Sequence, residues 1–110
     1  MTDGFKDRER GFENKWAHDA ELKFKVMARR NKLLGLWAAG EMGIAGDKAN
    51  EYAMTVVQAD FQKPGDEDVL EKVKADFAAA NLSHPDRAIR AKMEELLSVA
   101  GEQVMGETKK

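Results

Sequence analysis

The residues that most often carry catalysis are few in this chain and are not spaced for it. Its 110 residues include two histidines, His18 and His84, and no cysteine. The two histidines lie in different predicted elements, and neither belongs to an H-x-x-H or H-E-x-x-H pattern that would hold zinc. The lack of cysteine excludes disulfides, thiolate metal sites and cysteine nucleophiles. We therefore expect a protein with no catalytic residues and no metal site.

A glycine-containing stretch at 40–46, Gly-Glu-Met-Gly-Ile-Ala-Gly, is the closest approach to a phosphate-binding loop. A P-loop continues with Lys-Ser/Thr and follows a strand, and this stretch does neither. We interpret it as the end of a helix. Three basic residues upstream, Arg29, Arg30 and Lys32, leave a helical module that senses ATP or ADP as an alternative. The main interpretation requires no cofactor.

Length and composition predict one small, charged domain. Charged residues make up 35% of the chain and apolar residues 43%, with a net charge of -2. Such a balance is not the strongly basic footprint of a nucleic-acid-binding protein. No run of 18 apolar residues and no signal peptide is found, so we expect a cytoplasmic protein without membrane insertion.

Apolar residues recur at helical intervals, as in Val69, Val73 and Phe77, and no segment alternates as a strand would. Turn signals divide the chain into four helices at about 19–42, 47–62, 67–81 and 84–105. The predicted N-caps of the last three helices are Asp47, Asp66 and Ser83. The sequence therefore predicts an all-α fold, a small four-helix bundle over 19–106, with a frayed tail at 107–110.

The first helix is apolar over a wide arc, because Phe24 and Met27 extend its main stripe onto a neighbouring face. Such a helix is typical of the centre of a domain, or of a surface shared with another chain.

Residues 1–18 differ from the bundle in being densely charged and carrying three large aromatics. Phe5, Phe12 and Trp16 are separated by seven and four residues and would share one face of a helix. Each of the two glycines in the segment weakens a helix by about 1 kcal/mol relative to alanine, and an isolated helix of about 12–15 residues is marginal in water. We expect a flexible segment that becomes helical when a partner covers its aromatic face.

The residues expected to bind that partner carry apolar or charged side chains: Phe5, Arg8, Glu9, Arg10, Phe12, Glu13, Lys15 and Trp16. On this interpretation, replacing Phe12 and Trp16 by alanine changes thermal stability little. The alternative is that the first helix starts early and packs both aromatics on its own bundle.

Four stretches of the chain resemble the zeta subunit of alphaproteobacterial F-type ATP synthases. They are DRERGFENKWAHDAEL at 7–22, ARRNKLLGLWAA at 28–39, ADF at 59–61 and GDEDV at 65–69. The resemblance implies a four-helix protein that inhibits ATP hydrolysis by the catalytic head. It implies that the N-terminal segment inserts as a helix at the interface of the alpha, beta and gamma subunits and blocks hydrolytic rotation.

These subunits are thus the expected partners, and the protein is expected to associate peripherally with the membrane-bound enzyme and to be monomeric when free. A generic helical adaptor with an unrelated partner is the remaining alternative.

Overall fold

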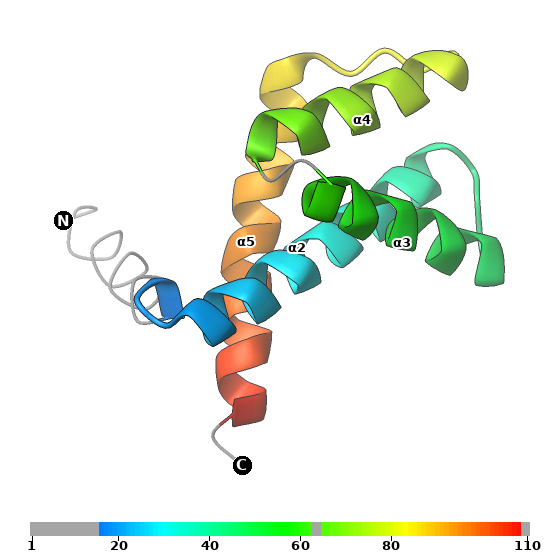
Figure 1. Ribbon diagram of the computed structural model, residues 1–110. Helices are drawn as coiled ribbons and strands as arrows, with labels where there is room; N and C mark the ends of the chain where they lie inside the picture. Colours follow the sequence, from blue (N-terminus) through cyan, green and yellow to red (C-terminus); the bar gives the residue numbers. More distant parts are fainter. Residues whose placement is uncertain (1–15, 63–64, 109–110) are drawn as a thin grey trace, which may run out of the picture.

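A computed structural model describes residues 16–62 and 65–108 of the chain, and these residues form helices and no strand (Figure 1). The elements are α2 (Ala20–Glu41), α3 (Asp47–Gln62), α4 (Asp66–Ala79) and α5 (Asp86–Thr108). The predicted all-α fold with four helices is confirmed. Figure 1 shows α2 crossing the long helix α5, with α3 beside α2 and α4 beyond α3.

The start of α2 is set by Asp19. Its carboxylate accepts hydrogen bonds from the backbone N–H groups of Glu21 and Leu22, at 3.0 and 3.1 Å. These are two of the donors that a helix leaves without an internal partner. The helix ends at Glu41, and Gly43 follows with φ +75°, a conformation that glycine adopts without strain.

Several details of the other helix ends differ from the prediction. Asp47 is not the N-cap of α3 but its first residue, and the carbonyl of Gly46 accepts from Ala49 and Asn50. The third helix ends at Ala79, two residues earlier than predicted.

Asp66 is not the N-cap of α4 but its first residue; the cap position is Gly65, at φ 144°. The last helix begins at Asp86, two residues later than predicted, and the carbonyl of Pro85 accepts from Ala88 and Ile89. Ser83 is therefore too early to be its N-cap. The same helix continues to Thr108, three residues past its predicted end.

The bundle has one core cluster that joins all four helices and a smaller one between α2 and α5. The first consists of Leu34, Ala38, Val56, Val69, Leu70, Val73, Phe77, Ile89 and Met93. The second consists of Trp16, Val26, Ala100 and Val104. The buried residues of each helix, such as Ala53, Val56 and Val57 of α3, are spaced by three and four positions, so each helix buries one stripe.

Helices α2 and α3 approach closely at Gly35. A Cβ atom on this glycine would lie 2.5 Å from the Cα atom of Ala53, well inside van der Waals contact. Both residues are buried. The small side chains at these positions therefore allow the two helix backbones to pack directly on each other.

A polar contact joins α3 to α4. The Tyr52 hydroxyl donates to Asp76 at 2.7 Å, and the Lys72 ammonium lies 3.0 Å from the same carboxylate. Burial of Tyr52, together with its bond to Asp76 and the charge there, raises the pKa of the tyrosine far above its usual value. Tyr52 therefore stays protonated and remains a donor.

Candidate functional site

The residues predicted to bind a partner fall into two groups in the structure. Seven of them, Phe5, Arg8, Glu9, Arg10, Phe12, Glu13 and Lys15, lie outside the described residues. Trp16 is described, and its position differs from the prediction.

Trp16 belongs to the core of the bundle. Its side chain is only 5% exposed and packs with Val26 of α2 and with Ala100 and Val104 of α5. The expectation that Trp16 buries its ring in a partner does not hold for this chain, in which the bundle itself covers the ring. The alternative stated for Trp16, packing on its own bundle, is the one observed.

The indole ring of Trp16 packs tightly against α5 at Gly101. A Cβ atom at Gly101 of α5 would lie 2.7 Å from the indole Nε1 of Trp16, so only glycine leaves room for the ring. The same Nε1 atom is buried, and it has no hydrogen-bond partner among the residues that the structure describes. Burying an N–H group without a partner costs about 1–3 kcal/mol. The apolar contacts of the ring must outweigh this cost.

Hydrogen bonds also fix the backbone between Trp16 and α2. Trp16 and Ala17 are helical, His18 forms a turn, and the backbone N–H of Asp19 donates to the carbonyl of Trp16 at 3.1 Å. Asp19 then caps α2 with its side chain. The boundary between leader and bundle, predicted at 18–19, therefore lies further upstream, before Trp16.

The three basic residues considered for nucleotide binding do not all meet at one site: Arg29 and Lys32 line the same hollow, and Arg30 lies apart from it. Arg29 donates to Gln103 at 2.9 Å and pairs with Glu107 at 2.8 Å, both in α5. Arg30 is buried and pairs with Asp66, whereas Lys32 is exposed. Because both guanidinium groups already have carboxylate partners, this arrangement offers no cluster of cations for a triphosphate.

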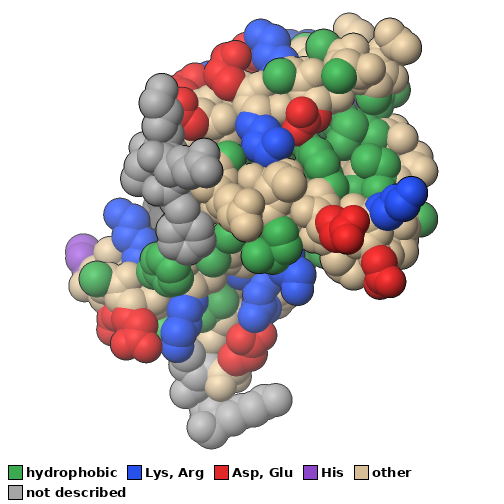
Figure 2. Space-filling view, turned by 45° about the vertical axis from the view of Figure 1, so that its right-hand side comes forward, with side chains coloured by type: hydrophobic (Ala, Val, Ile, Leu, Met, Phe, Trp, Pro, Cys, Tyr) green, Lys and Arg blue, Asp and Glu red, His purple; other side chains and the backbone are tan. Residues whose placement is uncertain are grey.

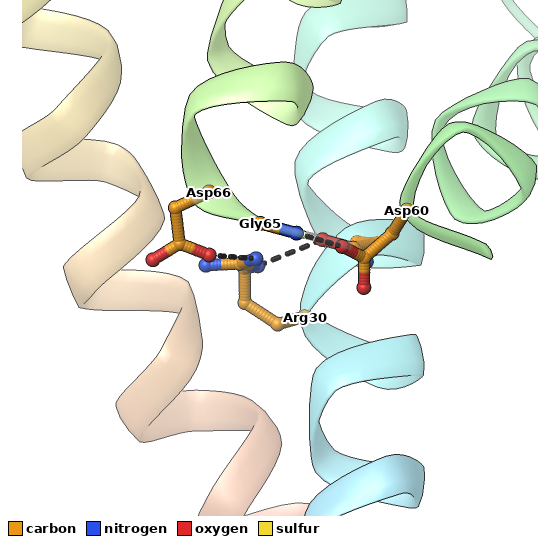
Figure 3. A network of polar contacts seen from close by, with 5 residues as sticks. Arg30, Asp60, Gly65 and Asp66 are labelled. Atoms are coloured by element: carbon orange, nitrogen blue, oxygen red, sulfur yellow. Dashed lines mark hydrogen bonds and ion pairs between the residues drawn. The ribbon is translucent and has the colours of Figure 1, made fainter. Parts of the chain in front are cut away.

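Arg30 is the centre of a polar network that the sequence analysis did not anticipate (Figure 3). Its Nε donates to the Asn31 carboxamide oxygen at 2.8 Å, and its Nη2 donates to Asp66 at 2.9 Å. Asn31 in turn donates to Asp60 at 3.0 Å, and Asp60 accepts from the backbone N–H of Gly65 at 3.3 Å. The network thus joins the middle of α2 to the end of α3 and the start of α4.

We expect Arg30→Ala to lower the free energy of unfolding by about 3 kcal/mol, because it leaves a cavity and an unpaired Asn31 oxygen. The Arg30 side chain is 1% exposed, whereas that of Asp66 is 58% exposed. Water can therefore replace the carboxylate, and Asp66→Ala should cost only about 1 kcal/mol. Urea titration of both variants measures the two values. Equal losses would show that the ion pair, and not burial of the arginine, dominates.

The histidines take structural positions. His84 packs against Phe77 with tilted rings and 4.6 Å between ring centroids, lies 5.8 Å from Trp37, and approaches Glu41 at 3.3 Å. His18 is exposed in the turn before α2. Among the described residues, no group of three or more His, Asp or Glu side chains is arranged to hold a metal ion.

An apolar groove lies along α2 and α3, and we refer to it as the α2–α3 groove. It consists of two adjoining hollows of about 390 and 340 Å³, which share Phe24, Ala28 and Val57. The first also involves Met27, and the second Met54 and Val104. The space-filling view shows hydrophobic side chains at the surface with Lys and Arg side chains beside them (Figure 2). The sequence signal for this groove is the second apolar face of the first helix.

The comparisons with known proteins agree with this architecture. The model of a protein family described as ATPase inhibitor subunit zeta matches residues 1–103. The chain belongs to the ATPase inhibitor subunit zeta family. The family resemblance expected from the sequence is thus confirmed, and with it the expectation of a regulatory subunit that inhibits an ATPase.

One solved structure similar to this zeta-family chain is a solution NMR structure of a protein with 49% sequence identity. The match covers 78% of this chain and 98% of the other, with a TM-score of 0.69. No curated protein matches the chain. Within the part of the chain that the structure describes, no helix is sufficiently long and apolar to cross a membrane.

Proposed function

We propose that this zeta-family subunit inhibits ATP hydrolysis by the catalytic head of an F-type ATP synthase. The segment upstream of Trp16 forms a helix that inserts at the interface of the alpha, beta and gamma subunits. The inserted helix blocks rotation in the hydrolytic direction, and rotation in the synthetic direction ejects it. The bundle stays on the outside of the head.

The observation that carries the proposal is that the family match begins at residue 1 and so includes this segment together with the bundle. The inserted face carries Phe5 and Phe12 as apolar anchors, and burying such side chains supplies about 1.5–3 kcal/mol each. Arg8, Arg10 and Lys15 pair with acidic groups of the head, and Glu9 and Glu13 with basic ones.

Trp16 has a different role in this proposal from the one that its sequence position first indicated. Because its ring is buried between α2 and α5, it fixes the root of the inserting segment on the bundle. The segment available for insertion is then residues 1–15.

The free protein is proposed to be a cytoplasmic monomer that associates peripherally with the membrane-bound enzyme, and to require no cofactor. Inhibition needs only contacts between polypeptides. Co-purification with alpha, beta and gamma subunits separates this proposal from a generic helical adaptor, and titration with ATP and ADP separates it from a nucleotide sensor.

The decisive experiment is removal of residues 1–15 with Trp16 retained. We expect the shortened chain to keep its melting temperature, because both core clusters remain, and to lose inhibition of ATP hydrolysis by the reconstituted head. A steady-state ATPase assay over a range of inhibitor concentrations measures this. If the shortened chain inhibits as strongly as the full chain, the inserting-segment mechanism is wrong.

The matched variant is Phe5→Ala with Phe12→Ala in the full chain, which removes the anchors without shortening the segment. It should weaken inhibition at an unchanged melting temperature. Deletion of residues 1–19 is a poor substitute, since it also removes the Trp16 ring and the Asp19 cap. Loss of inhibition in that variant would not distinguish a missing segment from a damaged bundle.

A further inference from the structure

Gly101 of α5 lies where any side chain would meet the ring of Trp16. A Cβ atom at Gly101 would be 2.7 Å from the indole Nε1, and the two next nearest atoms, at 3.5 and 3.6 Å, belong to the same ring. We propose that Gly101 is a positioning residue for inhibition. It admits the Trp16 ring between α2 and α5, and the N-terminal segment inserts in the head only while the ring is in place. The inference rests on the proposed function.

Helix α5 itself gives no reason for glycine at position 101. Gly101 lies well inside the helix and does not have a positive φ. Alanine is favoured over glycine at such a position by about fivefold in the equilibrium for forming the helix. The second glycine of α5, Gly106, has no described atom within 4 Å of its Cβ position. Of these two glycines, Gly101 is thus the one that a contact requires, and the contact is with Trp16.

Fit, and not a hydrogen bond, holds the ring. The ring is buried among Val26, Ala100 and Val104, and its Nε1 has no acceptor among the described residues. We refer to the space that the ring fills, between these three residues and Gly101, as the Trp16 pocket. A side chain at position 101 would compete with the ring for this pocket without having to break a polar contact of the indole.

The position of the ring determines where the N-terminal segment starts. Ala17 and His18 alone separate Trp16 from Asp19, which caps α2. The Trp16 carbonyl accepts from the backbone N–H of Asp19 at 3.1 Å. Trp16 is therefore fixed by its ring against α5 and by its carbonyl at the start of α2. The point and the direction from which the segment leaves the bundle follow from these two contacts.

Two possible roles of the ring predict inhibition losses of different size. If the ring only shortens the link between segment and bundle, its release adds residues 16–18 to that link. Doubling the length of a link lowers the effective concentration by about threefold. If insertion requires the ring in place, the apparent inhibition constant rises by the inverse of the fraction of chains with the ring in place. Keeping the ring out of about nine chains in ten then weakens inhibition about tenfold.

Gly101→Leu in the full chain tests the proposal. The leucine side chain would occupy the Trp16 pocket in place of the ring, so the pocket stays filled with apolar atoms and α5 gains a better helix former. We expect the inhibition constant for ATP hydrolysis by the reconstituted head to rise at least about tenfold, while circular dichroism shows a folded bundle. Gly106→Leu, in the same helix, is the matched control and should inhibit as the natural chain does.

Tryptophan fluorescence reports the position of the ring independently of inhibition. Trp37 is the other tryptophan of the chain, so in a Trp37→Phe background the emission comes from Trp16 alone. Gly101→Leu should move this emission to longer wavelength, because the ring enters water, and Gly106→Leu should not. An unchanged emission means that Gly101 does not control the ring. A shifted emission with inhibition weakened by less than about threefold means that the ring is only a tether. Either result overturns the proposal.

If leucine prevents folding, Gly101→Ala takes its place. The added methyl group meets Nε1, an atom that phenylalanine lacks, so Trp16→Phe in the same chain should restore inhibition. Inhibition that stays weak in the double variant, or that is not weakened in the single one, overturns the proposal. If Gly101 variants inhibit normally while removal of residues 1–15 abolishes inhibition, the proposed function stands and this inference does not.

Discussion

Trp16→Ala is expected to lower the free energy of unfolding of the full chain by about 3–5 kcal/mol, as large-to-small changes of buried aromatics do. The ring is 5% exposed and touches helices α2 and α5. Its removal leaves a cavity between Val26, Ala100 and Val104, and glycine at position 101 cannot extend a side chain into it. Chemical denaturation monitored by circular dichroism measures the loss. This differs from the sequence-based expectation that replacing Phe12 and Trp16 by alanine changes thermal stability little.

Trp16→Phe is the matched control. Phenylalanine keeps most of the ring and has no N–H, so it removes the buried donor that lacks a partner among the described residues. Relief of that desolvation cost offsets part of the lost contact, and we expect a net loss below about 1.5 kcal/mol. If Trp16→Ala is as stable as the natural chain, the ring is not part of the core. Trp16 then does not fix the start of the N-terminal segment on the bundle.

Gly35→Ala is also expected to destabilise the bundle, although it adds a single methyl group. Alanine favours a helix over glycine by about 1 kcal/mol. Against this, the new Cβ would lie 2.5 Å from the Cα of Ala53, and the obstructing atom is backbone. Overpacking of this kind costs about 1–3 kcal/mol and occasionally more. We expect the clash to outweigh the propensity, with a net loss of about 1–2 kcal/mol and a melting temperature lower by about 5–10 °C.

Gly40→Ala provides the comparison, because Gly40 lies in the same helix with no atom within 4 Å of its Cβ position. Only the higher helix propensity of alanine acts at this position, so this variant should be more stable than the natural chain by up to about 1 kcal/mol. Thermal unfolding of both variants against the natural chain separates the two effects. A Gly35→Ala protein that gains stability would show that α2 and α3 do not pack as closely as described.

The helices were predictable because their signals are local. Apolar residues spaced by three and four, together with glycines at the turns, placed each of the four helices within a few residues of the observed range. At one of the wrongly predicted N-caps, a tertiary contact competes with the local signal. Asp66 has the chemistry of an N-cap, but its carboxylate pairs with the buried Arg30 instead.

Burial of charged and aromatic side chains was harder to predict. Arg30 and Asn31 are polar residues in a charged helix, and such residues are usually exposed. They are buried where α2 meets the end of α3 and the start of α4. For Trp16 the spacing from Phe12 indicated a shared helical face, whereas the turn at His18 directs its ring into the bundle. No pattern within residues 1–19 specifies that turn's geometry.

The seating of Trp16 has a consequence for the kinetics of inhibition. On the proposed mechanism, if the bundle stays on the head when the segment is ejected, Trp16 holds the start of the segment close to its binding site. Return of the segment is then an intramolecular event, with an effective concentration of about millimolar for a short tether. Its rate would not depend on how many free inhibitor molecules surround the enzyme. One bound inhibitor molecule could therefore re-insert its segment after every reversal of rotation. The concentration of free inhibitor would affect only the rate of its first binding to the head.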